Sequence, residues 1–312
     1  MRVLVTGANG FIGRALVAGL AARNITFRAA VRGHGLSFCH DDHVIVSDIN
    51  ANTDWHDALI GVTHIVHLAA RAHITSQGFE DPLEVFRAVN TEGLLNLARQ
   101  AAQAGVSRFV FLSTCKVYGE GRDYAYTEKC EPSPQDHYAL SKWEAELGLN
   151  NIATHTAMET VILRSPLVYG PGVKGNFASM LRWLNSGVPL PLAGVSENRR
   201  SLLALDNLLD LIMTCLSQPA AANQTFLMSD GEDLSTAELL RRSAGALGRP
   251  ARLFNLPPAL LKLGARLMNK PGIYQRLCGS MQLDISMTRQ LLGWNPPVSV
   301  AEGLRRAAEG FQ

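Results

Sequence analysis

The stretch Met1-Arg-Val-Leu-Val-Thr-Gly-Ala-Asn-Gly-Phe-Ile-Gly13 decides the fold of this chain of 312 residues. Its first half is apolar and predicts a buried strand over residues 2–6. Its second half leads into a helical pattern and carries three glycines. Gly7 permits a tight turn, Gly10 lets the backbone approach a pyrophosphate, and Gly13 lets helix and strand pack closely. Because the motif joins a strand to a helix N-terminus, it predicts a dinucleotide site. We expect this site to contain Gly7, Asn9, Gly10, Phe11 and Ile12.

Strand and helix patterns alternate along the chain from that stretch onward. Strands are expected at residues 27–31, 44–46, 63–68, 109–112 and 160–163, and helices at 11–23, 54–60, 84–104 and 137–154. This alternation predicts an α/β fold with a Rossmann-type, doubly wound parallel sheet.

Proline and glycine become frequent after Arg164, and further helices are expected at 208–217, 235–247, 258–268 and 300–311. We therefore expect a dinucleotide-binding domain at residues 1–165. A smaller mixed α/β lobe at 166–312, intertwined with the first domain, would bind the substrate.

The composition indicates an ordered protein without a nucleic-acid partner. Hydrophobic residues make up 47% and charged residues 18%, and the formal net charge is only +2. A general nucleic-acid binder would need a strongly basic face. No acidic residue precedes Asp41, however, whereas five arginines do: Arg2, Arg14, Arg23, Arg28 and Arg32. We expect this segment to meet negative charge on a ligand.

The five cysteines form no C-x-x-C pair, so neither a disulfide framework nor a metal site is expected. The N-terminal residues contain no secretion signal pattern, and no run is long enough for a membrane span, which favours a cytoplasmic location. The apolar run that begins at Leu256 predicts an amphipathic surface helix. A membrane-surface or oligomer contact is the alternative for this run.

The end of the second strand reads Ala30-Val-Arg-Gly-His34 and contains no acidic residue. An acid there would hold the ribose hydroxyl of NAD, whereas the Arg32 guanidinium can bind a 2′-phosphate. This favours NADP, with NAD as the alternative if Arg32 is a solvated loop residue. Asp48, followed by Ile49, is expected near the adenine, unless it lies in a surface turn.

Tyr138-Ala-Leu-Ser-Lys142 places a phenol and an ammonium at i and i+4, on one face of the expected helix. The ammonium, together with a nicotinamide ring, is expected to lower the pKa of Tyr138 towards neutrality. Tyr138 could then exchange a proton with a carbonyl or an alcohol during hydride transfer. The hydroxyls of Ser113 and Thr114, at the end of a strand, would meet a sugar oxygen there.

These motifs together resemble the extended short-chain dehydrogenase/reductase family, which acts on nucleotide-linked sugars. The resemblance covers nearly the whole chain, and the motifs come in the family's order: TGANGFIG at 6–13, HLAA at 67–70, VNTEGLLNL at 89–97, STCKVYG at 113–119, YALSK at 138–142 and RSPLVYGPG at 164–172. It implies that Thr114, Tyr138 and Lys142 are the catalytic hydroxyl, the acid/base and its supporting cation. A homodimer through the helices at 84–104 and 137–154 is expected by the same resemblance.

The resemblance also implies further contacts. Residues expected at the cofactor, besides Tyr138 and Lys142, are Leu68, Ala69, Ala70, Asn90, Pro166 and Val168, with Leu167 beside the last two. Asn90 would brace the active-site strands, unless it lies on a helix surface. Asn176 and Arg199 would bind the nucleotide diphosphate, with Arg276 as a weaker second candidate. Lys116 is either a cation facing the substrate or a solvated loop residue.

Cys115 and Lys116 stand where sugar-nucleotide dehydratases have an acidic pair, so dehydration is not expected, and Cys115 is interpreted as a packed thiol. The stretches STCKVYGEG, GVKGNF and NRRSLLALDNLLD are most similar to bacterial UDP-4-keto-6-deoxy-hexosamine reductases and UDP-glucose 4-epimerase-like proteins. The leading hypothesis is an NADP-preferring reductase of a UDP-linked 4-keto-6-deoxy-N-acetylhexosamine, in the synthesis of bacterial surface polysaccharide. The alternatives are a UDP-hexose or UDP-N-acetylhexosamine 4-epimerase with tightly bound NAD, and a non-catalytic dinucleotide-binding protein.

Overall fold

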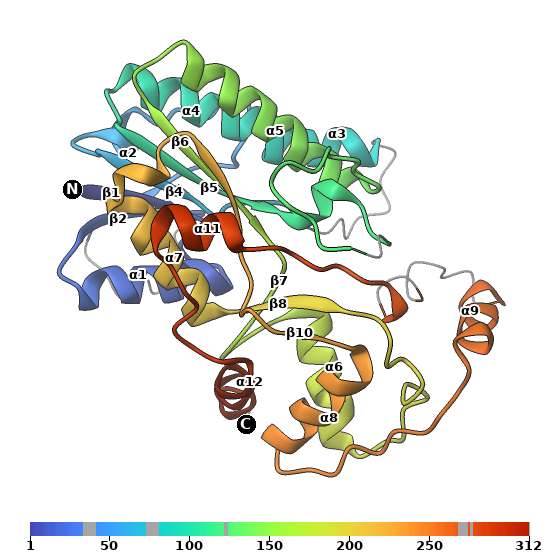
Figure 1. Ribbon diagram of the computed structural model, residues 1–312. Coiled ribbons are helices and arrows are strands. Elements are labelled where there is room, and N and C mark those ends of the chain that lie inside the picture. The colour runs from blue at the N-terminus through green and yellow to red at the C-terminus, as the bar shows by residue number, and fades with distance from the viewer. Residues whose placement is uncertain (34–41, 73–80, 122–123, 268–273, 275–276, 312) are drawn as a thin grey trace.

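Seven parallel strands form the main sheet of the computed structural model, which describes residues 1–311 except 34–41, 73–80, 122–123, 268–273 and 275–276 (Figure 1). The spatial order is β3-β2-β1-β4-β5-β6-β9. The bounds are β1 (Arg2–Thr6), β2 (Thr26–Val31), β3 (His43–Ile45), β4 (His64–His67), β5 (Arg108–Thr114), β6 (Glu159–Ser165) and β9 (Gln224–Leu227). The strand order reverses between β1 and β4, and a crevice at the carboxyl ends of such strands is where α/β proteins bind ligands. The expected α/β class is confirmed.

Helices cover both faces of this sheet (Figure 1). One face packs against α1 (Phe11–Ala22), α7 (Leu205–Ser217) and α11 (Ser286–Leu292), and the other against α2 (His56–Leu59), α4 (Leu94–Gln103) and α5 (His137–Thr154). Successive side chains of β1 alternate between the two cores, because Val3 and Val5 belong to the first and Leu4 to the second. A fully apolar strand is therefore what this position requires.

The predicted single helix over residues 84–104 is wrong in its middle. The structure has α3 (Pro82–Arg87), then a π-helical turn, η1 (Ala88–Gly93), and only then α4. Gly93 lies against Ile49, so that a Cβ at position 93 would come within 3.1 Å of the backbone nitrogen of Asn50. Such π turns are frequent at functional sites, and this one carries Asn90.

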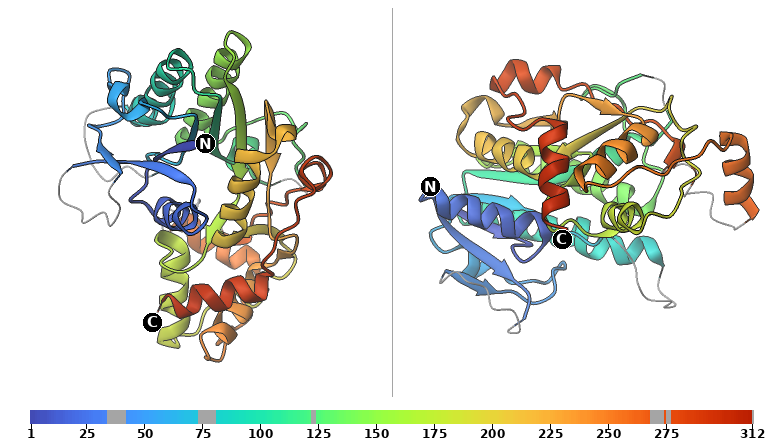
Figure 2. Two further views of the ribbon diagram at one scale, coloured as in Figure 1. Left: turned by 90° about the vertical axis from the view of Figure 1, so that its left-hand side faces the viewer. Right: turned by 90° about the horizontal axis from the view of Figure 1, so that it is seen from below.

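A smaller sheet of three strands, β10-β8-β7, forms a second lobe (Figure 2). Its elements are β7 (Leu167–Tyr169), β8 (Arg200–Ala204), β10 (Asp233–Leu234), α6 (Gly175–Ser186), α8 (Thr236–Ala246) and α12 (Val300–Glu309), and α9 (Pro258–Leu267) stands at its edge. The strands β7 to β10 and the helices α6 and α11 had no prediction from the sequence. Beyond residue 165, β9 joins the larger sheet, and α7 and α11 pack against it, so the chain crosses between the lobes more than once.

Candidate active site

The glycine turn between β1 and α1 lies against the loop that follows β4. Gly7 has a φ of +67°, and a Cβ on it would come within 2.8 Å of the backbone nitrogen of Ala69. A Cβ on Gly13 would overlap the Gly7 carbonyl oxygen and the Cα of Ala8. The first turn of α1 contains no acidic residue, and its N-cap is Gly10, which has no side chain to cap the helix. Helix N–H groups there are available to an anion from outside the chain.

A buried hydrogen bond joins the ends of β1 and β4 behind this turn. Thr6 Oγ1 lies 2.9 Å from His67 Nδ1 and also accepts from the backbone nitrogen of Ala69 at 3.3 Å. Burial, with the charge of Lys142 nearby, lowers the pKa of His67 to about 3. His67 is therefore neutral at physiological pH, and its hydrogen bond to Thr6 connects the end of β4 to the end of β1.

Asn90 connects the loop after β4 to α5. Its amide nitrogen donates to the carbonyl of Arg71 and to Ser141 Oγ, both at 3.0 Å, and its oxygen accepts from the Arg71 nitrogen at 2.8 Å. The side chain is 1% exposed. Buried amides with all partners in place hold their surroundings in one arrangement, and Ser141 stands between Tyr138 and Lys142 on α5.

Tyr138 and Lys142 lie on the face of α5 that meets the end of β5. Lys142 is 2% exposed, and its Nζ sits 4.0 Å from the centroid of the Phe111 ring. Burial lowers the pKa of Lys142 to about 7, although Glu146 opposes this shift. Burial also raises the pKa of Tyr138 to about 12, and Asp136 and Cys115 add to this. The lowering expected for the pKa of Tyr138 is thus absent from the protein alone, because burial disfavours the charged phenolate.

Thr114 ends β5 and begins the short 3₁₀ helix η2 (Cys115–Tyr118). Its Oγ1 accepts from the Lys116 nitrogen at 3.3 Å. Ser113, its neighbour, points to the other side of the strand and donates a hydrogen bond to Glu146. This bond, and an exposure of 4%, argue against the substrate contact expected for Ser113. The alternation of side chains along a strand already implies that adjacent hydroxyls face opposite ways, so the shared assignment of Ser113 and Thr114 overlooked a rule that the predicted strand contained.

Lys116 in η2 forms an ion pair with Asp136, with Nζ 3.0 Å from Oδ2. Asp136 also caps α5 by accepting from the Ala139 nitrogen at 2.7 Å. Neither of the roles expected for Lys116, a cation facing the substrate or a solvated loop residue, included this ion pair with Asp136, two positions before Tyr138. Cys115 is 4% exposed, and burial raises the pKa of its thiol to about 12, as suits a packed thiol.

The arginines of the first 40 residues do not all meet a ligand. Arg2 and Arg28 both pair with Asp42, at 2.5 and 2.9 Å, away from the glycine turn. Arg14 donates to the Asn9 carbonyl within the turn, at 3.0 Å. Arg32 is 70% exposed and lies 3.5 Å from Asp48, which is 86% exposed. Asp42, the second acidic residue of the chain, thus pairs with two of these five arginines.

Residues expected at the substrate, Asn176 and Arg199, and at the cofactor, Pro166 and Val168, lie in the second lobe or next to it. Asn176 is exposed in the first turn of α6, next to Phe177, whose ring stacks on Tyr169 at 5.3 Å. Arg199 is exposed and donates to the Ser196 and Asn198 carbonyls. Pro166 is buried between β6 and β7, and Val168 is half-buried on β7. Arg276 lies outside the described residues.

Two charged residues escaped the sequence reasoning. Glu146 is fully buried on α5, and Arg164 Nη2 binds its Oε2 at 2.6 Å. The signal for Glu146 was present in the sequence, since it follows Lys142 by the same four residues that separate Lys142 from Tyr138.

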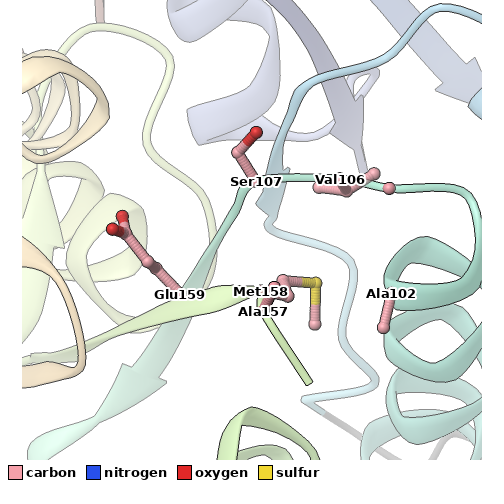
Figure 3. Close-up of a pocket in the computed structure, with 7 residues that line it drawn as sticks. Ala102, Val106, Ser107, Ala157, Met158 and Glu159 are labelled. Atoms are coloured by element: carbon pink, nitrogen blue, oxygen red, sulfur yellow. The ribbon is translucent and has the colours of Figure 1, made fainter.

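A cavity of about 230 Å³ lies at the opposite edge of the sheet, at the amino ends of β5 and β6 (Figure 3). Glu159 in its lining is paired with Arg108 at 2.6 Å. This cavity has none of the site residues. Among the residues that the structure describes, no three His, Cys, Asp or Glu side chains gather as metal ligands would. Within the same part of the chain no helix has the length and apolar character needed to span a membrane.

Comparison with known proteins supplies a family match. The model of a family described as the NAD dependent epimerase/dehydratase family matches residues 3–228. A protein of Vibrio cholerae named UDP-glucose 4-epimerase is 45% identical over 314 residues, which cover 99% of this chain and 95% of that protein.

Solved structures share the fold at lower identity. The crystal structure of UDP-N-acetylglucosamine 4-epimerase from Bacillus cereus superposes with a TM-score of 0.81 at 22% identity, covering 100% of this chain and 99% of that one. The structure of UDP-glucuronic acid 4-epimerase from Bacillus cereus in complex with NAD gives a TM-score of 0.79 at 21% identity, covering 100% and 96%.

Proposed function

This chain belongs to the NAD dependent epimerase/dehydratase family, and on that premise we propose that it is a 4-epimerase of a UDP-linked hexose or N-acetylhexosamine, with NAD as its cofactor. The observation that carries the proposal is the 45% identity with the Vibrio cholerae UDP-glucose 4-epimerase over 99% of the chain. The juxtaposition of Tyr138, Lys142 and the end of β5 supports it. The proposal adopts the 4-epimerase, which was an alternative in the sequence analysis, in place of the 4-keto reductase, which was the leading hypothesis.

The glycine turn fits a dinucleotide. Backbone crowding at Gly7 and Gly13 leaves no room for side chains, and the uncapped N-terminus of α1 offers N–H donors. We propose that Ala69 and Ala70 line the same cleft, and that Tyr138 and Lys142 hold the nicotinamide half. Bound there, NAD would supply a reversible hydride acceptor.

Tyr138 then takes the proton of the sugar 4-hydroxyl and later returns it to the same oxygen. Its phenol is protonated at neutral pH in the protein alone, so the positive charge that a bound ligand and Lys142 contribute must favour the phenolate. Thr114 Oγ1, at the carboxyl end of β5, would donate a hydrogen bond to the sugar oxygen. Asn90 holds α5 in register with the loop after β4, and so fixes where these groups meet.

The reductase of a UDP-linked 4-keto sugar is the second candidate, and one observation favours it. Residues 31–33 at the end of β2 contain no acid for the NAD ribose, and the Arg32 side chain is 70% exposed. The neighbouring Asp48 carboxylate, 3.5 Å from Arg32, would however repel a 2′-phosphate. For this reason we propose NAD rather than the NADP preference expected from the sequence.

Two measurements on the purified protein decide between the candidates. In the first, the protein is denatured and released dinucleotide is quantified; the epimerase should release NAD close to one per chain. In the second, UDP-glucose and UDP-N-acetylglucosamine are each incubated with the protein and followed by proton NMR for the axial 4-hydroxyl product. Interconversion without net NADH formation is the expected result. No interconversion, together with NADPH oxidation by a UDP-4-keto sugar, would overturn the epimerase in favour of the reductase.

A further inference from the structure

Glu146 sits in the interior of the protein with every hydrogen-bonding position of its carboxylate in use. Arg164 donates to both of its oxygens, with Nε 3.3 Å from Oε1 and 3.0 Å from Oε2, and Nη2 2.6 Å from Oε2. Ser113 donates its hydroxyl to Oε1. All of these groups are donors, which are the partners that carboxylate oxygens accept from.

The surroundings hold this carboxylate in one place. Ser113 and Arg164 face each other in register on β5 and β6. Arg164 Nη1 also donates to Tyr118 Oη at 2.6 Å, and the Tyr118 ring stacks on Tyr126 at 5.0 Å. Glu146 and Arg164 side chains are 0% and 6% exposed. A buried carboxylate with such partners cannot turn away from its helix face.

That helix face is the one that carries the proposed acid/base pair. Tyr138, Lys142 and Glu146 follow each other at intervals of four residues on α5, so they stack along one side of the helix, about 6 Å apart. The other charged or titratable groups near Lys142 are His67 from β4, which is neutral, and Arg164 from β6, which Glu146 already binds. Within the described residues, no hydrogen bond to Lys142 Nζ stabilises its charge, and a contact with the Phe111 ring takes that place. Glu146 is therefore the anion that offsets the burial of the lysine.

We propose that Glu146 is a positioning residue that acts through Lys142: its carboxylate, fixed by Ser113 and Arg164, keeps the buried ammonium charged and in place beside Tyr138. This inference rests on the proposed function for its catalytic meaning, but its electrostatic part concerns the free protein. Glu146 touches neither substrate nor cofactor. Its effect is to keep the pKa of Lys142 close to 7 rather than well below it.

The titration of Lys142 itself tests the proposal without any substrate. The chain has only six lysines, so protein labelled with ¹³C at lysine Cε gives few signals, and Lys142→Arg identifies the one that disappears. In the native protein this signal should titrate near pH 7. In Glu146→Gln we expect the midpoint to fall by at least about one pH unit, since a removed opposite charge shifts a buried group by roughly 1–3 units. Glu146→Asp, which keeps the charge, should restore most of the difference.

Glu159→Gln provides a matched control. Glu159 also pairs with an arginine across β5 and β6, with Oε2 2.6 Å from Arg108 Nη2, but at the other end of the same two strands. Its removal should leave the Lys142 midpoint unchanged. Equal midpoints in the native protein and Glu146→Gln would overturn the proposal, as would equal shifts in Glu146→Gln and Glu159→Gln.

Removing one member of a buried ion pair is costly, and Glu146→Gln alone could fail to fold. The double variant Glu146→Gln/Arg164→Gln removes both charges and leaves no unpaired ion. Glu146 is the charge that raises the pKa of Lys142, so the midpoint should again fall in this variant, by less than in Glu146→Gln because a nearby cation is removed as well. An unchanged midpoint contradicts the proposal.

The catalytic part has a separate readout. If the epimerase is active, Glu146→Gln should lower kcat and move its alkaline limb to lower pH, while KM for the sugar nucleotide stays within about twofold. An unchanged kcat profile alongside a shifted Lys142 titration would show that the proposed role of Lys142, not the influence of Glu146, is wrong.

Discussion

Tyr138, Lys142 and His67 show how burial sets the chemistry of individual side chains in this protein. Each carries a titratable group inside the fold, and in each case burial moves the pKa in the direction that disfavours charge. Tyr138 is consequently protonated at neutral pH in the protein alone. At Lys142 the charge of Glu146 opposes this trend.

Tyr138→Phe removes only the phenolic oxygen, so the fold should survive while proton transfer is lost. We expect turnover of the sugar nucleotide to fall by roughly 10²–10⁴-fold, with unchanged thermal unfolding and unchanged NAD binding by fluorescence titration. Tyr124→Phe, at a tyrosine that is 58% exposed, should keep full turnover. Retained activity in Tyr138→Phe would mean that another group moves the proton.

His67 should make the protein sensitive to acid. Its pKa is about 3 in the folded chain and near 6.5 when unfolded, so the unfolded state binds the extra proton first as the pH falls. Its contribution is therefore complete above pH 6.5 and is lost progressively below it, by about 3 kcal/mol between pH 7 and pH 4.5.

Urea unfolding of the native protein and of His67→Gln at these two pH values measures this loss. The variant should lose less stability than the native protein over the same interval. Replacement of the exposed His155 by Gln is the control and should leave the pH dependence as it is. Parallel curves for His67→Gln and the native protein would refute the assignment.

At the scale of elements, two irregular turns shape the site. The glycine turn brings the N-terminus of α1 close to the loop after β4, and the π turn η1 aims Asn90 at α5. Both depend on backbone packed too tightly for a side chain, at Gly13 and at Gly93. The regular part of α1 has room for a Cβ, as at Gly19.

Gly13→Ala tests this crowding, because its Cβ would lie 2.7 Å from the Cα of Ala8 and would push the glycine turn outward. We expect a loss of about 1–3 kcal/mol in unfolding free energy and at least a tenfold weaker NAD affinity by calorimetry. Gly19→Ala lies on the same helix with its nearest contact at 3.5 Å, the flexible end of Met213. It should be neutral, or stabilising by up to about 1 kcal/mol. Similar NAD affinity in both variants would contradict a phosphate site at this turn.

The whole molecule is held together by chain segments that return to the first sheet. Phe226 on β9 and Leu208, Leu211 and Ile212 on α7 are fully buried in the same core as Val3. Asp230 ties the second lobe to this core, since it accepts from Tyr169 Oη, Asn207 Nδ2 and the Ala204 nitrogen, each at 2.7 Å.

A fragment of residues 1–165 should therefore not fold by itself. Without β9 and α7 one face of the sheet would lose much of its apolar cover. We expect aggregation or a gradual loss of far-UV circular dichroism in urea, whereas the full chain should give a sigmoidal transition. A cooperative transition in the fragment would show that the first domain is independent.

The sequence by itself determined the parts of this protein that depend on short spacing. The glycine turn, the strands up to residue 165 and the relation of Tyr138 to Lys142 were predictable, because periodicity and turn chemistry act over a few residues. The same spacing of four residues also places Glu146 on the helix face of Tyr138 and Lys142, although no sequence pattern indicated Arg164 as its partner.

Only the tertiary structure decided which distant groups meet. Ser113 turns to Glu146 instead of the substrate, Arg2 and Arg28 turn to Asp42 instead of a ligand, and β9 joins the first sheet from beyond residue 165. Each of these outcomes depends on the direction of a side chain or on a strand pairing across many residues. Packing of the complete chain selects among such arrangements, because the local sequence alone does not specify which distant groups meet.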